Sequence, residues 1–256
     1  VPADIFGVDR LCNVINYSSW SGLVVLGGKV KYPSADEWEM TSYMMNKRPK
    51  AEELKNDFFN NHRADVHPRV LATEDDFARV RELIKTDKNA KKMFDNIKEQ
   101  ANKYMKEPLQ YYHLSDGVRL LSVSSAVRNL ALYAGFVYRV TGEKEYAERL
   151  AQELVNVAEN FEDWHPIHYL DTGEMAFGMG LGYDWIYDYL SEEQRKTIAQ
   201  GMKQCGIDVY LEQYIQQAGW TRSDSNWGFI CNGGGVAMAV ALADEYPDEC
   251  FAIVES

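Results

Sequence analysis

The stretch RLLSVSSAVRNLALYAGFVYRVTGEKEYAERLAQELVNVAENF, residues 119–161, contains two helix patterns of different character, separated by a turn at Thr141-Gly142. The first half is apolar on nearly every face, which predicts a buried helix. The second half alternates apolar positions with Glu, Lys and Arg, as a helix with one solvent-exposed face does. We therefore expect an inner and an outer helix that pack antiparallel as a hairpin.

The same pairing recurs further along the chain. Residues 171–190 are apolar and rich in small side chains, whereas residues 191–217 are amphipathic. Ser191 and Gln194 have the spacing of a capping box, which predicts that the outer helix begins there. Residues 233–243 repeat the small, apolar pattern. No fixed sequence repeat accompanies these pairs, which disfavours the consensus solenoids.

The remaining segments complete the predicted architecture. Thr73 and the three acidic residues after it predict a helix start, and residues 88–106 predict a second helix that ends before Pro108. Residues 1–66 predict an irregular N-terminal arm, with a hairpin through residues 26–29 and a short helix over 51–59. The fold class is therefore all-α, with an incomplete (α/α) toroid over residues 67–256, since this length holds fewer helices than a closed toroid needs.

Charge and composition exclude several classes of function. The net charge of -12 argues against a nucleic-acid partner, because phosphate contacts need a basic surface. Four cysteines, Cys12, Cys205, Cys231 and Cys250, are far apart and match no zinc spacing, which favours free buried thiols over a metal site. No apolar run is long enough to span a bilayer, so no membrane partner is expected, and nothing in the sequence calls for a cofactor.

Three segments carry a resemblance to a known family. They are residues 67–84 (HPRVLATEDDFARVRELI), 168–198 (HYLDTGEMAFGMGLGYDWIYDYLSEEQRKTI) and 226–245 (NWGFICNGGGVAMAVALADE). In this order and spacing they resemble the heparinase II/III-like superfamily, closest to the toroid domain of oligoalginate lyases, and dermatan-sulfate epimerase is similar. The resemblance implies a toroid followed by β-sandwich domains, which cleaves uronic-acid polysaccharides by β-elimination.

The resemblance also implies partners and a location. The partner would be an acidic polysaccharide or oligosaccharide, and the toroid would pack on a C-terminal β-sandwich that lies outside this chain. Relatives of this kind act in the periplasm or outside the cell, although no signal peptide is visible at Val1.

Asn226 is the catalytic candidate that the resemblance implies, as an amide that neutralises the substrate carboxylate in the transition state. Trp227 follows where many relatives have His, and Gly228 replaces a second Asn. The Tyr that serves as the acid in relatives is expected beyond Ser256. The resemblance therefore implies a site that this chain alone does not complete.

The residues themselves allow structural alternatives at this stretch. Asn226 could instead be an N-cap that satisfies free backbone donors. Trp227 could stack on a sugar ring or pack in the core, and Asn232 is expected to be a structural amide. Residues 233–235 are not followed by Lys-Ser/Thr, so their glycines indicate close helix packing and not a phosphate loop.

Charged residues elsewhere are candidates for substrate binding. Asp171 and Glu174 are three residues apart after His168, so they are either acid/base groups on one helix face or part of a capped polar network. Arg128 lies on the most apolar helix, where it must pair with a carboxylate such as Glu174 or face a cleft. Arg222, the last cation of the chain, is a further binding candidate. Residues 183–185 (YDW) are expected to form a structural cluster.

Three functions remain open at this point: a uronate lyase, an (α/α)-toroid glycoside hydrolase with Asp171 or Glu174 as the acid, and a non-catalytic glycan-binding or structural module. Elimination forms an unsaturated product that absorbs ultraviolet light, whereas hydrolysis does not. We take the lyase as the leading hypothesis.

Overall fold

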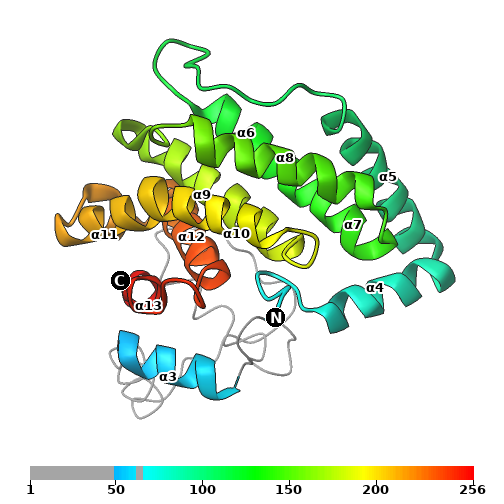
Figure 1. Ribbon diagram of the computed structural model, residues 1–256, viewed down its shortest axis with the longest axis horizontal. Coiled ribbons are helices and arrows are strands. Elements are labelled where there is room, and N and C mark those ends of the chain that lie inside the picture. The colour runs from blue at the N-terminus through cyan, green and yellow to red at the C-terminus, as the bar shows by residue number, and fades with distance from the viewer. Residues whose placement is uncertain (1–48, 62–65) are drawn as a thin grey trace, which may run out of the picture. The chain divides into compact units, whose positions relative to one another are not determined.

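The computed structural model describes residues 49–61 and 66–256 of the chain. The expected hairpin at residues 26–29 and most of the expected arm lie outside the described residues. The described residues form helices and no strand, which confirms the all-α class (Figure 1).

The helices are named in chain order. They are α3 (Ala51–Asn61), α4 (Glu74–Thr86), α5 (Lys88–Tyr104), α6 (Leu121–Leu130), α7 (Phe136–Thr141), α8 (Lys144–Asn160), α9 (Tyr169–Trp185), α10 (Glu192–Met202), α11 (Asp208–Ile215), α12 (Asn226–Ala241) and α13 (Pro247–Glu255). One π-helical turn (Ala131–Gly135) joins α6 to α7 and another (Lys203–Ile207) joins α10 to α11, so each pair forms a continuous rod.

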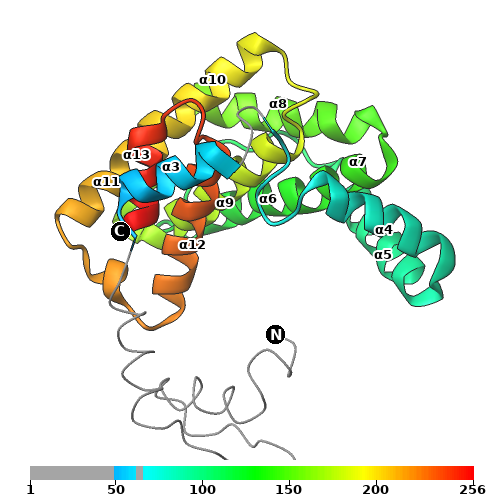
Figure 2. The same ribbon diagram turned by 90° about the horizontal axis from the view of Figure 1, so that it is seen from below.

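The expected burial of an inner helix is present in full in α9 but on only one face of α6 and α7. Along the rod of α6 and α7, the apolar face is buried, whereas α8 alternates buried and exposed positions. In α9, every residue except Leu170 and Phe177 is buried. This helix lies between α6 and α12 (Figure 2), and its neighbours cover nearly its whole circumference.

The register of α9 against α12 shows that the two helices run parallel. A Cβ added to Gly173 would lie 3.0 Å from the Cα of Cys231, and one added to Gly180 would lie 2.6 Å from the Cα of Met238. Going from the first contact to the second moves forward by the same number of residues along α9 and along α12. The two helices therefore run in the same direction. The approach is closer than any side chain other than hydrogen allows on α9.

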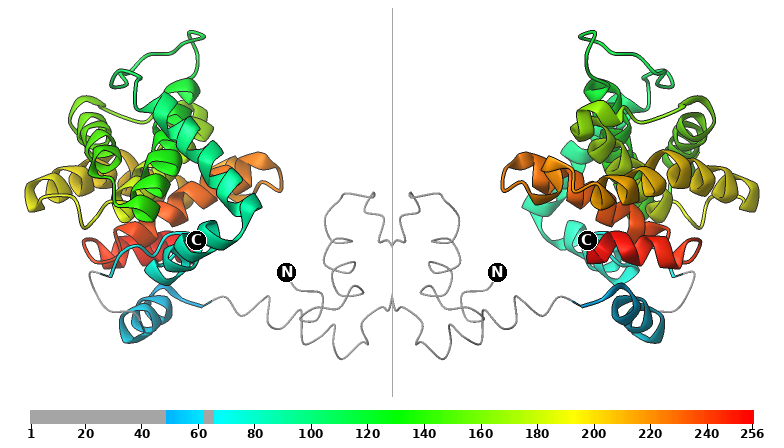
Figure 3. Two further views of the ribbon diagram at one scale, coloured as in Figure 1. Left: turned by 90° about the vertical axis from the view of Figure 1, so that its right-hand side faces the viewer. Right: turned by 90° about the vertical axis from the view of Figure 1, so that its left-hand side faces the viewer.

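The same reasoning places α6 parallel to α9. Asp171, in the first turn of α9, accepts a hydrogen bond from the backbone N–H of Leu120, just before α6 begins. Two turns on, a Cβ at Gly178 would lie 2.7 Å from the Cα of Arg128. The starts of α6, α9 and α12 are therefore at one end of a parallel three-helix layer. The connection over residues 105–120 projects beyond the helices at the end of the layer where α6 begins (Figure 3).

The short helix expected at residues 51–59 is present as α3, and it packs on α13. The ring centroids of Phe58 and Phe251 are 5.4 Å apart, and Glu255 accepts a hydrogen bond of 2.7 Å from the backbone N–H of Ala51. The compact unit that contains α13 therefore begins at Lys50. This helix, which the sequence places in the arm, belongs to the helical unit.

The end of α9 anchors the segment that leads to α4. The Asp184 carboxylate accepts hydrogen bonds from the backbone N–H groups of Arg69 (2.9 Å) and Val70 (2.8 Å), and its Oδ1 lies 2.6 Å from Nδ1 of His67. The indole N–H of Trp185 donates to the carbonyl of Val70 at 2.9 Å. Both residues therefore have the structural role predicted for the YDW cluster.

Candidate functional site

Two candidate residues meet where α9 and α12 begin. His168 is the N-cap of α9, and its imidazole contacts the Trp227 indole edge to face, with ring centroids 5.0 Å apart. The His168 side chain is 22 % exposed, and Trp227 is half-buried. The chain therefore brings an imidazole and an indole together at a surface that solvent reaches.

Asn226 lies in the first turn of α12 and is exposed. Its alternative interpretation as the N-cap is wrong, because Ser225 is the cap and its hydroxyl accepts from the backbone N–H of Trp227 at 3.4 Å. Ser225 stands directly before the first residue of the helix and has the extended backbone conformation that a cap needs. No hydrogen bond joins the Asn226 amide to any other residue in the part of the chain that the structure describes.

A buried carboxylate holds His168 in place. Asp171 is fully buried, and its Oδ1 lies 2.7 Å from Nδ1 of His168. Its Oδ2 lies 2.9 Å from Nδ1 of His165 and accepts a bond of 2.6 Å from the N–H of Leu120. Three donors therefore satisfy this carboxylate, as a buried charge requires. This geometry favours the polar-network alternative for Asp171 over acid/base work at the surface.

The loop before α6 reaches this network. The Tyr112 hydroxyl donates to Asp163 at 3.2 Å, and partial burial together with this carboxylate raises the pKa of Tyr112 to about 12. The nearby Asp171 charge contributes to the same rise. Tyr112 therefore stays protonated at neutral pH beside the histidine network.

Arg128 makes the pairing with Glu174 that its sequence context demands. Nη1 of Arg128 lies 2.5 Å from Oε2 of Glu174, and Nη2 and Nε donate to Oδ1 of Asn129 at 2.9 and 3.2 Å. The Arg128 side chain is 29 % exposed, so the ion pair is reachable from solvent. Asn129 in turn donates to the Tyr104 hydroxyl at 2.8 Å. The candidate cation is thus held in a four-residue polar network.

Glu174 also lies close to α12. Burial raises the pKa of the Cys231 thiol to about 12, and the Glu174 carboxylate is the second cause of this rise. Glu174 therefore stands between Arg128 on α6 and the first half of α12. Asp171 and Glu174 follow one another on α9 but serve different networks, one with histidines and one with arginine.

Two other candidates have less to offer. Arg222 is exposed at the end of a short 3-10 turn, and among the described residues no hydrogen bond or ion pair connects it to the site. Asn232 accepts from the Tyr214 hydroxyl at 2.7 Å and donates to the carbonyl of Gly228 at 2.8 Å. It links α11 to α12, in agreement with the structural role expected for it.

Among the residues of these networks that sequence reasoning missed are His165, Asn129 and Tyr104, besides Asp163 and Tyr112 on the loop side. The segment HPIHYLD places two histidines and an aspartate within seven positions, and this signal points to His165. Asn129 was detectable only as the neighbour of Arg128. Tyr104 had no signal, because its contact with α6 depends on how α5 packs.

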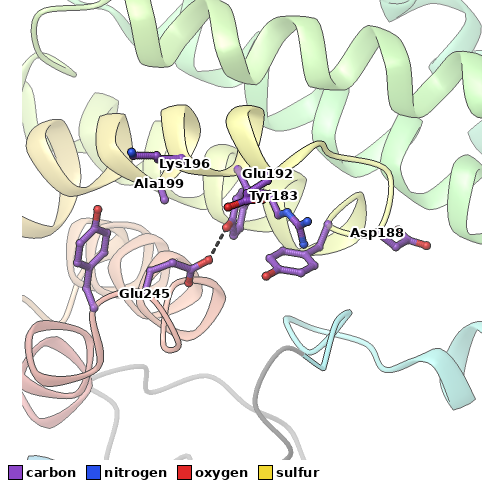
Figure 4. Close-up of a pocket in the computed structure, with 9 residues that line it drawn as sticks. Tyr183, Asp188, Glu192, Lys196, Ala199 and Glu245 are labelled. Carbon is purple, nitrogen blue, oxygen red and sulfur yellow. Dashed lines mark hydrogen bonds between the residues drawn. The ribbon is translucent and has the colours of Figure 1, made fainter.

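A separate cavity of about 770 Å³ lies at the opposite end of α9 (Figure 4). In it the Tyr183 hydroxyl donates to Glu245, and the Arg195 guanidinium lies 4.6 Å from the centroid of the Tyr187 ring. Asp188, Glu192 and Lys196 also line it. The walls of this cavity carry charges of both signs.

In comparison with known proteins, no family model and no curated protein matches the sequence. None of the described helices has the length and apolar character needed to cross a bilayer.

Proposed function

We propose that this chain is part of an (α/α)-toroid polysaccharide lyase of the heparinase II/III-like type. It would cleave uronic-acid polysaccharides by β-elimination in the periplasm or outside the cell. The parallel layer of α6, α9 and α12, with α8 and α10 outside it, is the arrangement that such a toroid repeats. A β-sandwich outside this chain would complete the enzyme.

The observation that carries the proposal is the free amide of Asn226. β-Elimination removes the proton next to a carboxylate, so negative charge grows on that carboxylate and must be neutralised by hydrogen-bond donors. Asn226 offers an exposed amide with no protein partner in the described part of the chain, and it directly precedes Trp227, whose ring contacts His168. An indole at that position suits the apolar face of a sugar ring.

The negative net charge of the chain makes a local cation important for binding an acidic polysaccharide. At a net charge of -12 the chain as a whole repels an acidic polysaccharide. Arg128 is a partly exposed guanidinium that its neighbours hold in a fixed orientation. A guanidinium recognises carboxylates through paired N–H donors, so Arg128 is the residue suited to attract a uronate.

The same geometry disfavours the hydrolase alternative. A general acid must hold a proton within reach of the glycosidic oxygen. Asp171 is fully buried with both oxygens occupied, and Glu174 is in an ion pair with Arg128. Neither carboxylate offers a proton to a substrate in this arrangement.

The test uses the natural protein that carries these residues and a panel of saturated uronate oligosaccharides. We expect an ultraviolet-absorbing unsaturated product from at least one of them. The variant N226A should lower kcat/KM about 100- to 1000-fold, the loss typical of one oxyanion donor. N96A is the matched control, because Asn96 is also exposed on a helix and lies on α5.

Other results would contradict the proposal. New reducing ends without ultraviolet absorbance would identify a hydrolase. Saturable binding without any turnover would identify a glycan-binding module. Equal rates for N226A and N96A would remove Asn226 from the chemistry.

A further inference from the structure

The two histidines of HPIHYLD share one carboxylate, and this fixes their protonation pattern. An ionised carboxylate accepts hydrogen bonds and donates none. His165 and His168 both approach Asp171 through Nδ1, so Nδ1 carries the hydrogen in each ring. In the neutral rings Nε2 is then left with a free lone pair, which is a proton acceptor.

The two rings differ in their access to solvent. His165 is buried, whereas the His168 side chain is 22 % exposed and lies against Trp227. Among the described residues, no hydrogen bond engages Nε2 of His168. One histidine therefore supports the carboxylate, and the other presents a basic nitrogen on the partly exposed ring that contacts Trp227.

The support is rigid. The Leu120 N–H holds Asp171 from the start of α6, and the N–H of His165 donates to Asp163 at 2.8 Å. His165 adopts a left-handed backbone conformation, with φ 60°, that non-glycine residues seldom occupy. Such strain persists only where the surroundings impose it, and it is frequent at functional sites.

We infer that Nε2 of His168 is the base that removes the proton next to the substrate carboxylate, and that Asp171 is its positioning residue. This inference rests on the proposed function. The proton passes to Nε2, and the C–H electron pair becomes the new C=C bond as the glycosidic C–O bond breaks. Solvent water protonates the leaving oxygen, and the imidazolium then returns its proton to solvent.

The charged and titratable groups around His168 are consistent with this role. Asp171 faces Nδ1 from α9, and His165 shares that carboxylate from the preceding loop. Asp163 and Tyr112 lie beyond it on the loop side, and Trp227 is the uncharged neighbour from α12. Among the described residues, the ion pairs of Asp171 are with these two histidines and with no Lys or Arg.

The first experiment is chemical rescue. H168G removes the imidazole, and glycine is well tolerated at an N-cap, so α9 should still begin normally. We expect kcat to fall about 100- to 10000-fold, the range for loss of a general base. Added imidazole should restore part of the rate, and more basic substituted imidazoles should restore more. A residue with only a structural role would show neither effect.

A matched control separates the proposed base from other histidines. H113Q alters a half-exposed histidine outside the network, and it should keep kcat within a few-fold of wild type when thermal unfolding shows it folded. D171N should lower kcat with KM unchanged, and it should have no further effect on kcat in H168G, because Asp171 acts through His168.

The outcomes distinguish this inference from the proposed function. An active wild-type protein with H168G within about threefold of its rate, well below the loss expected for a general base, overturns the inference and leaves the lyase standing. Absence of rescue by imidazole also overturns it. A wild-type protein that forms no unsaturated product overturns the lyase, and the inference falls with it.

Discussion

Asp171 and Asp184 are both fully buried, one in the first turn of α9 and one near its end. A buried carboxylate is tolerated only where donors replace the lost water. Asp171 takes its donors from the start of α6 and two histidines, and Asp184 takes its donors from residues 67–70. Each carboxylate therefore fastens an earlier part of the chain to α9.

At the same scale, the buried thiols should be chemically inert in the native protein. Burial, with some help from Asp163, raises the pKa of Cys205 to about 11, and burial with Glu174 raises that of Cys231 to about 12. The thiolate is the reactive form, so at pH 8 both remain thiols. We expect mass spectrometry after iodoacetamide treatment to find them unmodified in native protein and modified in urea. Labelling of Cys231 in native protein at pH 8 would show that α12 opens.

Asn226 shows how far single residues can be assigned from sequence. The segment SDSN offers four residues that all favour caps, and only the observed start of the helix at Asn226 selects Ser225. The pairing of Arg128 was more predictable, because a cation on an apolar helix needs a carboxylate partner. Glu174 is the carboxylate that the neighbouring inner helix α9 supplies. Pairing constraints can thus be anticipated where cap choice cannot.

At the scale of elements, adjacent glycines on α12 give a matched test of helix contact. A Cβ on Gly234 would lie 2.1 Å from the carbonyl oxygen of Gly173, whereas one on Gly233 meets nothing within 4 Å. G234A should therefore destabilise the protein by about 1–3 kcal/mol or more, because the α9 backbone must move. G233A should stabilise it by about 0.5–1 kcal/mol, because alanine is the better helix former. Urea unfolding measures both.

The glycine comparison can fail in a clear way. If G234A and G233A have the same free energy of unfolding, α9 and α12 are not in backbone contact. The parallel layer of α6, α9 and α12 would then be wrong at the contact between α9 and α12.

The attachment of α3 should depend on pH. The Lys50 ammonium and the Ala51 N–H lower the pKa of Glu255 below its usual 4.5. A carboxylate whose pKa is lower when α3 is docked stabilises docking above pH 4.5, and this contribution is lost as pH falls through the lowered value. We expect hydrogen-exchange protection factors over residues 51–61 to fall under acid conditions.

Variants separate this effect from general acid unfolding. E255Q should reduce protection of residues 51–61 already at pH 7, whereas E249Q, on the same helix, should not. Unchanged protection in E255Q would mean that the remaining contacts with α13, the Phe58–Phe251 rings and the Lys55–Asp248 ion pair among them, hold α3 without Glu255.

Element positions followed the sequence closely, and for identifiable reasons. The capping box at Ser191 and Gln194 is present, with bonds of 3.0 and 3.2 Å, because it depends only on local spacing. The burial of α9 followed from its composition. The π-helical turns and the left-handed backbone of His165 had no signal, since they arise from packing against other segments.

On the scale of the whole molecule, the contacts that matter most join distant parts of the chain. The Arg69 guanidinium donates to the carbonyls of Val240 and Ala241, at 3.0 and 2.9 Å, and its backbone N–H donates to Asp184. Residues 67–70 therefore close across the ends of both α9 and α12. The sequence places each of these residues in its own element but gives no indication that they meet.

Asp184 should accordingly control the stability of the whole helical unit. D184N keeps the shape but replaces one accepting oxygen with an amide N–H, which faces donors from His67, Arg69 and Val70. Leaving such buried groups unsatisfied costs about 3 kcal/mol or more. D188N is the control, because Asp188 is exposed and its ion pair with Arg139 belongs to a class worth about 1 kcal/mol or less. Urea unfolding should show a lower midpoint for D184N. The m value should be unchanged, because the helical unit still unfolds as one cooperative unit. A loss no larger than that of D188N would show that the Arg69 guanidinium and the Trp185–Val70 hydrogen bond hold residues 67–70 without Asp184.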